Sequence, residues 1–301
     1  KIVDIENCML QHEASNTVMN IVKTWAVKHK ISIYDEVNHI GLLRHVVVKV
    51  GYKTGDIMVI LVTNGQEIPH KEQLIEKLSE VNSVKSIVLN VNTKNTNVIM
   101  GKQNIVFYGK PYIHDYIGDI KFRLSPLSFF QVNPIQVETL YDKALEYAGL
   151  TGEENVIDLY CGIGTISLYL ARNAKKVYGV EIVSQAVLDA RVNAKINGFQ
   201  NVEFIEGAAE DVLPSLAKGG VKSDIIIVDP PRRGCDEKTL ETMVQLASSR
   251  IVYISCNPST LARDLRYLED RGYKTKKVQP VDMFPRTHHV ECIALIQREI
   301  M

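Results

Sequence analysis

The sequence lacks any long uninterrupted apolar stretch. No run approaches the roughly 18 residues that a membrane-spanning helix requires, and no secretory signal pattern opens the chain. We therefore expect a cytoplasmic protein with no membrane partner. Its five cysteines are odd in number and scattered along the 301 residues. That pattern indicates reduced thiols rather than a disulfide framework.

An excess of charge of either sign is absent as well. Lys plus Arg and Asp plus Glu each number 35, so the formal net charge is zero. Proteins that bind nucleic acid mainly through charge are strongly basic. Any contact with nucleic acid must therefore come from local patches or from a part of the protein that this sequence lacks. The chain opens at Lys1 without an initiator methionine and within a strand-like pattern, which favours a fragment.

The first part of the chain mixes helical and strand patterns. Small and polar residues at 14–16 precede an apolar period and predict a capped helix. Residues 44–50 and 57–63 predict a β-hairpin, and residues 71–81 have helical spacing. Residues 86–101 predict a second hairpin that turns around 94–97. We therefore expect an α+β domain over residues 1–122.

Helical and strand patterns alternate from about residue 134 onward. This alternation predicts an α/β domain with a parallel, doubly wound, Rossmann-like sheet, preceded by the smaller α+β domain. Residues 273–284 and 288–298 predict an antiparallel hairpin that finishes the sheet. The expected division is an α+β domain, a linker at 123–133, and the α/β domain at 134–301.

A glycine turn lies between a predicted strand and a predicted helix at residues 158–167. Gly162 and Gly164 let the backbone approach a ligand and expose N–H groups at a helix start. Ser167 occupies the third glycine position of the dinucleotide fingerprint, which disfavours an NAD-dependent oxidoreductase without excluding it. Glu181 ends the next strand, where a carboxylate can bind both ribose hydroxyls of a nucleoside. The alternative for Glu181 is a solvated helix cap.

Other carboxylates also stand beside the predicted strands. Asp158 precedes the glycines, Asp229 follows an apolar strand, and the pair at 210–211 follows another. Each could contact a nucleoside ligand or only cap a helix. Arg232 and Arg233, after two prolines, could equally meet phosphate or solvent.

Cys256 comes directly after the apolar strand at 251–254, at the edge where such sheets bind ligands. A cysteine there can be a nucleophile or a small structural thiol. Arg263, Arg286 and the histidines at 288–289 are candidates to lower its pKa if the fold brings them close.

Glu291 lies in the last predicted strand among apolar residues. Strand alternation puts it on the face opposite Val290 and Cys292. It could therefore face a cleft or solvent.

Five motifs in order resemble the RNA 5-methyluridine (uracil-C5) methyltransferases. They are FFQVN (129–133), DLYCGIG (158–164), VDPPRRG (228–234), SCNPSTLARD (255–264) and HHVEC (288–292). The resemblance implies a Rossmann-like methyltransferase domain that uses S-adenosylmethionine to methylate carbon 5 of a uridine in RNA.

Carbon 5 of uracil is a poor nucleophile. A thiolate that adds to carbon 6 activates it, and a base must later remove the proton on carbon 5. By the resemblance, Cys256 is the nucleophile and Glu291 the general base. The residues implied in donor binding are Gln131, Tyr160, Thr165, Glu181 and Asp229. Phe129 is implied as an aromatic near a uridine turned out of its stack.

The N-terminal part resembles the central domain of the ribosomal RNA branch of this family. Cys8 in IENC (5–8) matches the last of four cysteines that hold a 4Fe–4S cluster. The other three ligands and a small β-barrel RNA-binding domain would precede residue 1. One cysteine cannot hold a cluster, so we expect this chain to lack it. Cys8 as an ordinary thiol is the alternative.

The favoured substrate is 23S ribosomal RNA, with RNA and not DNA as the partner. Transfer RNA uridine methylation, cytosine-C5 methylation of RNA and a nucleotide-dependent oxidoreductase stay as alternative enzymes. A non-catalytic RNA-binding module is the alternative of a different class. That module predicts that Cys256→Ser leaves all function intact.

Overall fold

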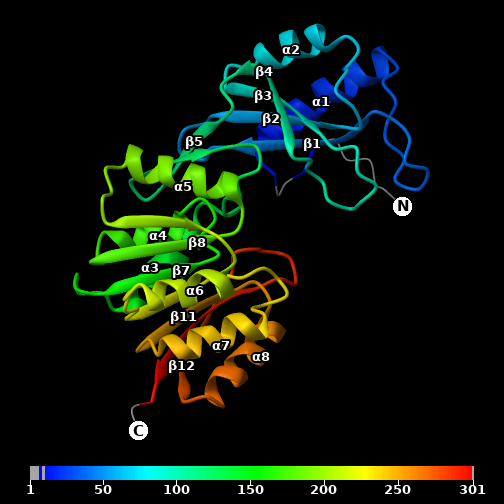
Figure 1. Ribbon diagram of the computed structural model, residues 1–301. Helices are drawn as coiled ribbons and strands as arrows, with labels where there is room; N and C mark the ends of the chain where they lie inside the picture. The colour runs from blue at the N-terminus through cyan, green and yellow to red at the C-terminus, as the bar shows by residue number, and fades with distance from the viewer. Residues whose placement is uncertain (1–6, 9–10, 300–301) are drawn as a thin grey trace. The chain divides into compact units, whose positions relative to one another are not determined.

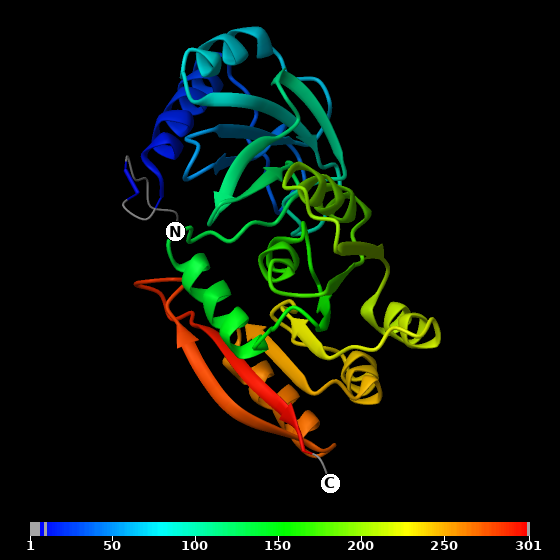
Figure 2. The ribbon, with the colours of Figure 1, turned by 90° about the vertical axis from the view of Figure 1, so that its left-hand side faces the viewer.

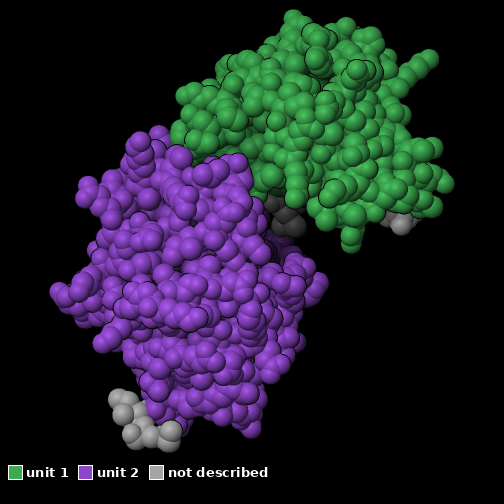
Figure 3. Space-filling view, in the orientation of Figure 1, with its two compact units in different colours: residues 1–116, 123–127 green, residues 117–122, 128–301 purple. Residues whose placement is uncertain are grey.

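The computed structural model describes residues 7–8 and 11–299, and it divides into two compact units (Figures 1 and 3). Unit 1 comprises residues 1–116 and 123–127, and unit 2 comprises residues 117–122 and 128–301. The chain passes from one unit to the other and back through two short strands, β5 (Ile113–Ile117) and β6 (Ile120–Leu124), which pair with each other. The segment expected to be a linker therefore contributes 123–127 to unit 1 and 128–133 to unit 2.

Unit 1 is built on a four-stranded sheet in the order β1-β2-β3-β4. Its elements are α1 (Glu13–Lys28), β1 (Leu43–Val50), β2 (Ile57–Thr63), α2 (Lys71–Ser79), β3 (Val84–Val91) and β4 (Gln103–Gly109). The predicted hairpin of β1 and β2 and both predicted helices are confirmed. The cap of α1 is His12, however, and residues 14–16 lie inside the helix. Strands β2 and β3 are parallel because α2 carries the chain across between them. Apolar side chains of both helices and the sheet share one core.

The second predicted hairpin of unit 1 is wrong in its pairing. Strand β3 pairs with β4, which starts at Gln103, and not with the apolar residues 98–101. The side chain of Asn92 donates to the carbonyls of Val98 (2.7 Å) and Ile99 (3.0 Å). Asn90 Oδ1 in turn accepts from the N–H of Gly101 at 2.6 Å. These buried amides take the backbone groups that a strand partner would need, so the segment forms a loop.

Unit 2 is built on a seven-stranded sheet in the order β12-β13-β11-β10-β7-β8-β9. Its strands are β7 (Asn155–Leu159), β8 (Lys176–Glu181), β9 (Val202–Glu206), β10 (Ile225–Val228), β11 (Arg250–Ser255), β12 (Tyr273–Val281) and β13 (Glu291–Arg298). Its helices are α3 (Gln136–Ala148), α4 (Thr165–Ala171), α5 (Ser184–Ile196), α6 (Ala209–Lys218), α7 (Glu237–Leu246) and α8 (Pro258–Glu269). Figure 2 shows helices on both sides of this sheet.

The five strands from β11 to β9 are parallel, and β13 runs antiparallel to both of its neighbours. The predicted doubly wound sheet and its closing hairpin are thus confirmed. Central strand β10 consists of four apolar residues that are all buried, as expected where helices cover both faces. The strand order reverses between β7 and β10, and ligands of such sheets bind beside this switch point.

None of the helices in the part of the chain that the structure describes is long and apolar enough to cross a membrane.

Candidate active site

Chemically active side chains gather at the carboxyl ends of the unit 2 strands. Tyr160 follows β7, Asp229 follows β10 and Cys256 follows β11, while Glu181 is the last residue of β8. Glu291 is the first residue of β13, which enters the sheet at the same edge because it is antiparallel to β11. The sheet therefore brings together five residues that are far apart in the sequence.

The ladder between β11 and β13 ends beside Cys256 and Glu291. Its last pair joins Ser255 to Cys292, so Cys256 comes directly after this pair on one strand and Glu291 directly before it on the other. The charge of Glu291 contributes to the raised pKa of Cys256. Cys256 is only partly buried, whereas Glu291 is 3% exposed. The solvent-facing alternative for Glu291 is therefore wrong: β13 lies between β12 and β11, inside the sheet.

Burial changes the acidity of both carboxylates at this edge. Removal from water, together with the charge of Asp229, raises the pKa of Glu291 to about 8. Burial raises the pKa of Asp229 to about 7. Carboxyl groups with pKa values this close to neutrality can exchange protons near physiological pH, as a general base or acid must.

The thiol of Cys256 sits in a mixed electrostatic environment. Desolvation raises its pKa, the charges of Glu291 and Asp229 raise it further, and the cation of Arg232 lowers it. At neutral pH the group is accordingly a thiol, and Arg232 is the side chain that stabilises its ionised form.

The sequence had suggested other cations for this task. Arg263 does not face Cys256: its guanidinium pairs with Asp264 at 2.7 Å and donates to the carbonyl of Arg233 at 3.0 Å. Arg232 is two residues before Gly234 in the conspicuous VDPPRRG motif, but only the fold shows that this loop bends over the end of β11.

The loop at 229–235 is clamped to the start of α8. Asn257 Nδ2 donates to the carbonyl of Arg232 at 3.0 Å, and Arg263 donates to the carbonyl of Cys235 at 3.0 Å. Buried Asp264 accepts from the N–H of Cys235 at 2.9 Å and from the hydroxyl of Tyr253 at 2.6 Å. The VDPPRRG and SCNPSTLARD motifs, which are separate in the sequence, are thus held together by hydrogen bonds. These bonds fix the position of Arg232 relative to Cys256.

The glycine turn after β7 forms the other half of the site. Gly162 has a φ of +54°, and a Cβ added there would meet no atom within 4 Å, so the backbone is open on that side. Its N–H donates to Glu181 Oε2 at 3.1 Å, while Glu181 Oε1 accepts from the N–H of Val183 at 2.8 Å. The Glu181 carboxylate is therefore held in place at the strand end, with lone pairs left for a ligand.

Tyr160 has a φ of +62° and therefore a strained, left-handed backbone. Its half-buried ring packs against the core, and its hydroxyl meets Thr239 of α7. Thr165, the first residue of α4, shares a hydrogen bond of 2.8 Å with Tyr141.

Tyr141 is a site residue that the sequence argument missed. It is fully buried on α3, and this burial, followed by the charges of Asp229, Asp158 and Glu291, raises its pKa. The signal in the sequence was a hydroxyl on the apolar face of a helix, which is unusual unless the hydroxyl has a partner.

Asp158 is 0% exposed, and Ser167 donates a short hydrogen bond to one oxygen of its carboxylate. Burial raises its pKa to about 7. Asp211 is exposed in the first turn of α6 and pairs with Lys238 at 2.9 Å.

The segment before α3 carries Phe129 and Gln131. Phe129 is 69% exposed, and Gln131 is partly buried. Phe130 packs against Phe122 at 5.9 Å between ring centroids. Asn133 caps α3 by accepting from the N–H of Gln136 at 3.1 Å. The segment therefore holds one aromatic ring inward and presents the other to solvent.

Cys8 lies in unit 1, partly buried, and its N–H donates to Asn16 Oδ1 at 3.3 Å. Among residues 7–8 and 11–299, no group of three His, Cys, Asp or Glu side chains is placed to hold a metal ion.

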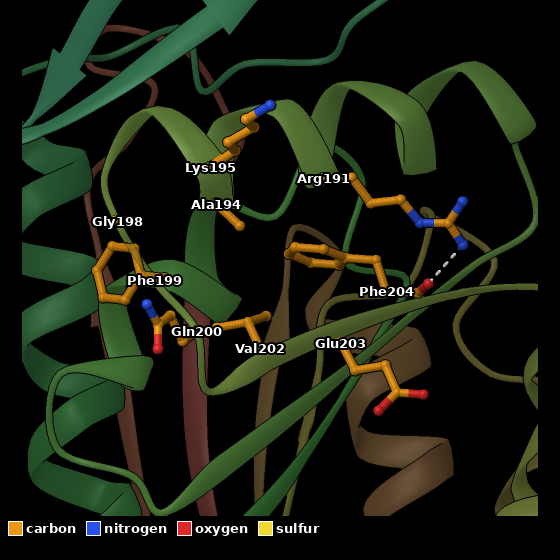
Figure 4. A pocket seen from close by; sticks show the side chains of 9 residues that line it. All are labelled: Arg191, Ala194, Lys195, Gly198, Phe199, Gln200, Val202, Glu203 and Phe204. Atoms are coloured by element: carbon orange, nitrogen blue, oxygen red, sulfur yellow. Dashed lines mark hydrogen bonds between the residues drawn. The ribbon is translucent and has the colours of Figure 1, made fainter.

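An open pocket of about 550 Å³ lies elsewhere in unit 2, where α5 ends and β9 begins (Figure 4). Lys195 and Phe199 line it, and Arg191 donates to the carbonyl of Phe204 at 2.8 Å. It lies at the amino end of β9, away from the strand ends that carry Cys256 and Glu181.

A doubly wound sheet closed by an antiparallel β13, with a glycine turn after β7 and an acidic residue ending β8, defines a Rossmann-like methyltransferase fold. The structure matches the crystal structure of the tRNA (uracil-54, C5)-methyltransferase of Pyrococcus abyssi in complex with S-adenosyl-L-homocysteine. The TM-score is 0.81 at 30% identity, and the match covers 98% of this chain and 70% of that one. Trm5b of the same organism shares the fold alone, with a TM-score of 0.55 at 15% identity.

Residues 14–299 match the sequence model of the tRNA (uracil-5-)-methyltransferase family, and the chain belongs to this family. It is 58% identical over 299 residues to a protein of Caldanaerobacter subterraneus and 54% identical over 296 residues to one of Clostridium tetani. Both are described as uncharacterized RNA methyltransferases. The matches cover 99% and 98% of this chain but only 66% and 64% of the relatives, so the chain spans less than two-thirds of their length.

Proposed function

We propose that this chain carries the active site of an RNA (uracil-C5)-methyltransferase that uses Cys256 as nucleophile and Glu291 as general base. The observation that carries the proposal is the end of the β11–β13 ladder, where a partly exposed cysteine and a buried carboxylate of raised pKa lie next to the last strand pair, Ser255 and Cys292. Family membership supplies the reaction type.

In the proposed reaction, the Cys256 thiol first loses its proton to solvent water, and its sulfur then forms a bond to carbon 6 of the uracil. The electrons of the C5–C6 double bond move toward O4 as an enolate. Carbon 5 then takes the methyl group from the donor's sulfonium, whose S–CH3 bond breaks so that S-adenosylhomocysteine leaves as a neutral thioether. The Glu291 carboxylate then accepts the proton on carbon 5. The electrons of that C–H bond restore the double bond, and the thiolate leaves carbon 6.

The methyl donor in this proposal is S-adenosylmethionine, whose sulfonium supplies an electrophilic methyl group when bound. The open backbone beside Gly162 and the oriented carboxylate of Glu181 fit a nucleoside with ribose hydroxyls. The other proposed donor-binding residues are Gln131, Tyr160, Thr165 and Asp229. Exposed Phe129 is proposed to contact the target base.

Ribosomal RNA is the proposed substrate, and the argument for it is the likeness of the segment around Cys8 to the ribosomal branch. The Pyrococcus enzyme is described as acting on uracil-54 of tRNA, which makes tRNA the competing substrate. The described residues of this chain do not fit an iron–sulfur cluster by themselves, because Cys8 has no partner ligands among them. No step of the proposed reaction involves a cluster.

The deciding experiment is mass spectrometry of the full-length protein after incubation with S-adenosylmethionine and 5-fluorouridine-substituted RNA. Fluorine on carbon 5 cannot leave as a proton, so the enzyme should stall with its cysteine bound to RNA. The adduct should map to Cys256, vanish in Cys256→Ala and persist in Cys292→Ala, the buried neighbour on β13. An adduct on another cysteine, or none despite RNA and donor binding, would refute the assignment of Cys256.

The same reaction, run on separate 23S ribosomal RNA and tRNA transcripts, tests the substrate. A 5-methyluridine product in ribosomal RNA alone supports the proposal. Product in tRNA alone would reject the ribosomal assignment while leaving the chemistry intact.

A further inference from the structure

The loop between β12 and β13 gathers aromatic rings beside the candidate nucleophile. It spans residues 282–290 and leads into Glu291, whose neighbour Cys292 pairs with Ser255, the residue directly before Cys256. Neither the proposed chemistry nor the donor site uses its side chains.

Three rings of this loop form a contiguous group. The rings of His288 and His289 lie 4.1 Å apart between centroids, and Phe284 meets His289 edge-on at 6.0 Å. Thr287 holds the turn together by donating from its hydroxyl to the carbonyl of Phe284 at 2.8 Å and accepting from the N–H of His289 at 3.1 Å. His288 is exposed, and the other two rings are partly exposed.

The base of the loop is fixed to the rest of unit 2. Met283 is 1% exposed, and its carbonyl accepts from Asn133 Nδ2 at 3.3 Å. Asn133 belongs to the segment that carries exposed Phe129. The base of the loop that carries the rings is therefore held in place by the rest of unit 2.

Arg286 stands at the tip of the loop in a strained conformation. Its φ is +66°, a left-handed backbone that is strained for a residue other than glycine. Its side chain is exposed, as are those of Arg232 and Arg233. Within residues 7–8 and 11–299, none of these three arginines forms an ion pair, unlike Arg263.

The loop at 282–290 and the nearby Arg232 combine exposed arginines with partly or fully exposed aromatic rings, and this combination suits one kind of partner. Arg232 lies close enough to both Cys256 and His289 to lower the pKa of each. Arg232 therefore lies near both the loop and Cys256. A polyanion whose flat bases stack on rings suits unpaired arginines beside exposed aromatic side chains.

We propose that the loop at 282–290 binds single-stranded RNA next to the target uridine, with Phe284, His288 and His289 stacking on bases and Arg286 contacting a phosphate. This inference rests on the proposed function, because it takes RNA as the substrate. The inference identifies the surface that binds the nucleotides on either side of the target uridine.

The test measures binding of a short oligouridylate carrying one 2-aminopurine to the full-length protein, by fluorescence and over a range of salt concentrations. We expect the His288→Ala/His289→Ala variant to bind about tenfold more weakly, since each stacked base contributes strongly. The ring-conserving His288→Phe should bind like the wild type. Arg286→Gly should reduce the slope of log K against log salt by about 0.7 while relieving the backbone strain, so its stability should not fall.

Lys276→Ala is the matched control, because Lys276 is an exposed cation on β12 outside the loop. Loop variants with wild-type affinity and salt slope, a Lys276→Ala effect as large as theirs, or no probe binding by the wild type would overturn the inference. If the wild type still forms the Cys256 adduct in those cases, the inference alone fails. Loop-dependent binding without any adduct would instead sink the proposed function and leave the inference standing.

Discussion

At the scale of single residues, the pairing of Cys256 with Glu291 has an electrostatic cost. A carboxylate that faces a thiol disfavours the thiolate, and burial makes that effect stronger. Both Glu291 and Asp229 raise the pKa of Cys256, and Arg232 opposes them. Cys256 is therefore held as the thiol, the form that is less readily oxidised than the thiolate.

We expect Glu291→Gln to make Cys256 more reactive toward iodoacetamide while abolishing methylation. The neutral amide removes a charge that holds the thiol pKa up, so more thiolate is present at a given pH. The lower thiol pKa should raise the alkylation rate about three- to tenfold. The measurement is the rate of modification of Cys256 at pH 8, resolved by peptide mass spectrometry.

Glu269→Gln is the control for this experiment, because Glu269 is an exposed carboxylate at the end of α8. An unchanged alkylation rate in Glu291→Gln would mean that the two side chains do not interact. Retained methylation would remove Glu291 from its proposed role.

At the scale of elements, the start of α8 and the loop at 229–235 act as one piece. Gly234 has a φ of +75° and packs against the clamp: a Cβ there would lie 2.6 Å from both Arg263 Nη2 and Asp264 Oδ2. Gly198 has a φ of +72°, but a Cβ there would meet nothing within 4 Å. Alanine would be strained at both positions but crowded only at Gly234, so comparing the two substitutions isolates the effect of crowding.

We expect Gly234→Ala to destabilise unit 2 by more than Gly198→Ala. Both substitutions place alanine in a left-handed conformation, which costs about 1 kcal/mol. Only Gly234→Ala also forces its new Cβ against Arg263 and Asp264, which destabilises the folded state by about 1–3 kcal/mol more. Urea unfolding measures the difference. Equal effects would show that the loop moves freely and that the clamp does not fix Arg232.

At the scale of the whole molecule, three buried carboxyl groups link stability to pH. Asp158 and Asp229 have pKa values of about 7, and Glu291 of about 8. All three values are raised above those of an unfolded chain, near 4. Between about pH 4 and pH 8 the unfolded chain binds fewer protons than the folded one, so the free energy of unfolding falls as pH rises.

We therefore expect unit 2 to be more stable at pH 5 than at pH 8, and Asp158→Asn to remove part of that difference. The amide oxygen can still accept from Ser167, and no charge needs to be buried. The variant should gain on the order of 2 kcal/mol at pH 8 and little at pH 4. Hydrogen exchange in β10 at both pH values provides the measurement. A wild type that grows more stable toward pH 8 would contradict the linkage.

The sequence by itself determined the layers of unit 2. Helical and strand periods alternate from residue 134, and local hydrophobic patterning decides which face each element buries. It also located Cys256, Glu181 and the glycine turn at strand ends, because such residues follow directly on apolar strands. It failed for the hairpin after Val91, where two asparagines form long-range hydrogen bonds that no periodicity reveals.

Only the tertiary structure decided which side chains meet. Cys256 and Glu291 come close because β13 lies between β11 and β12, and the order of strands in a sheet cannot be read from the sequence pattern of any one strand. The tertiary structure also brings Arg232, rather than Arg263, close to the Cys256 thiol, and it buries Tyr141 near three carboxylates. The physical reason is common to all of these. Hydrophobic periodicity is a local property of the chain, whereas the position of a charge relative to a nucleophile depends on contacts between distant segments.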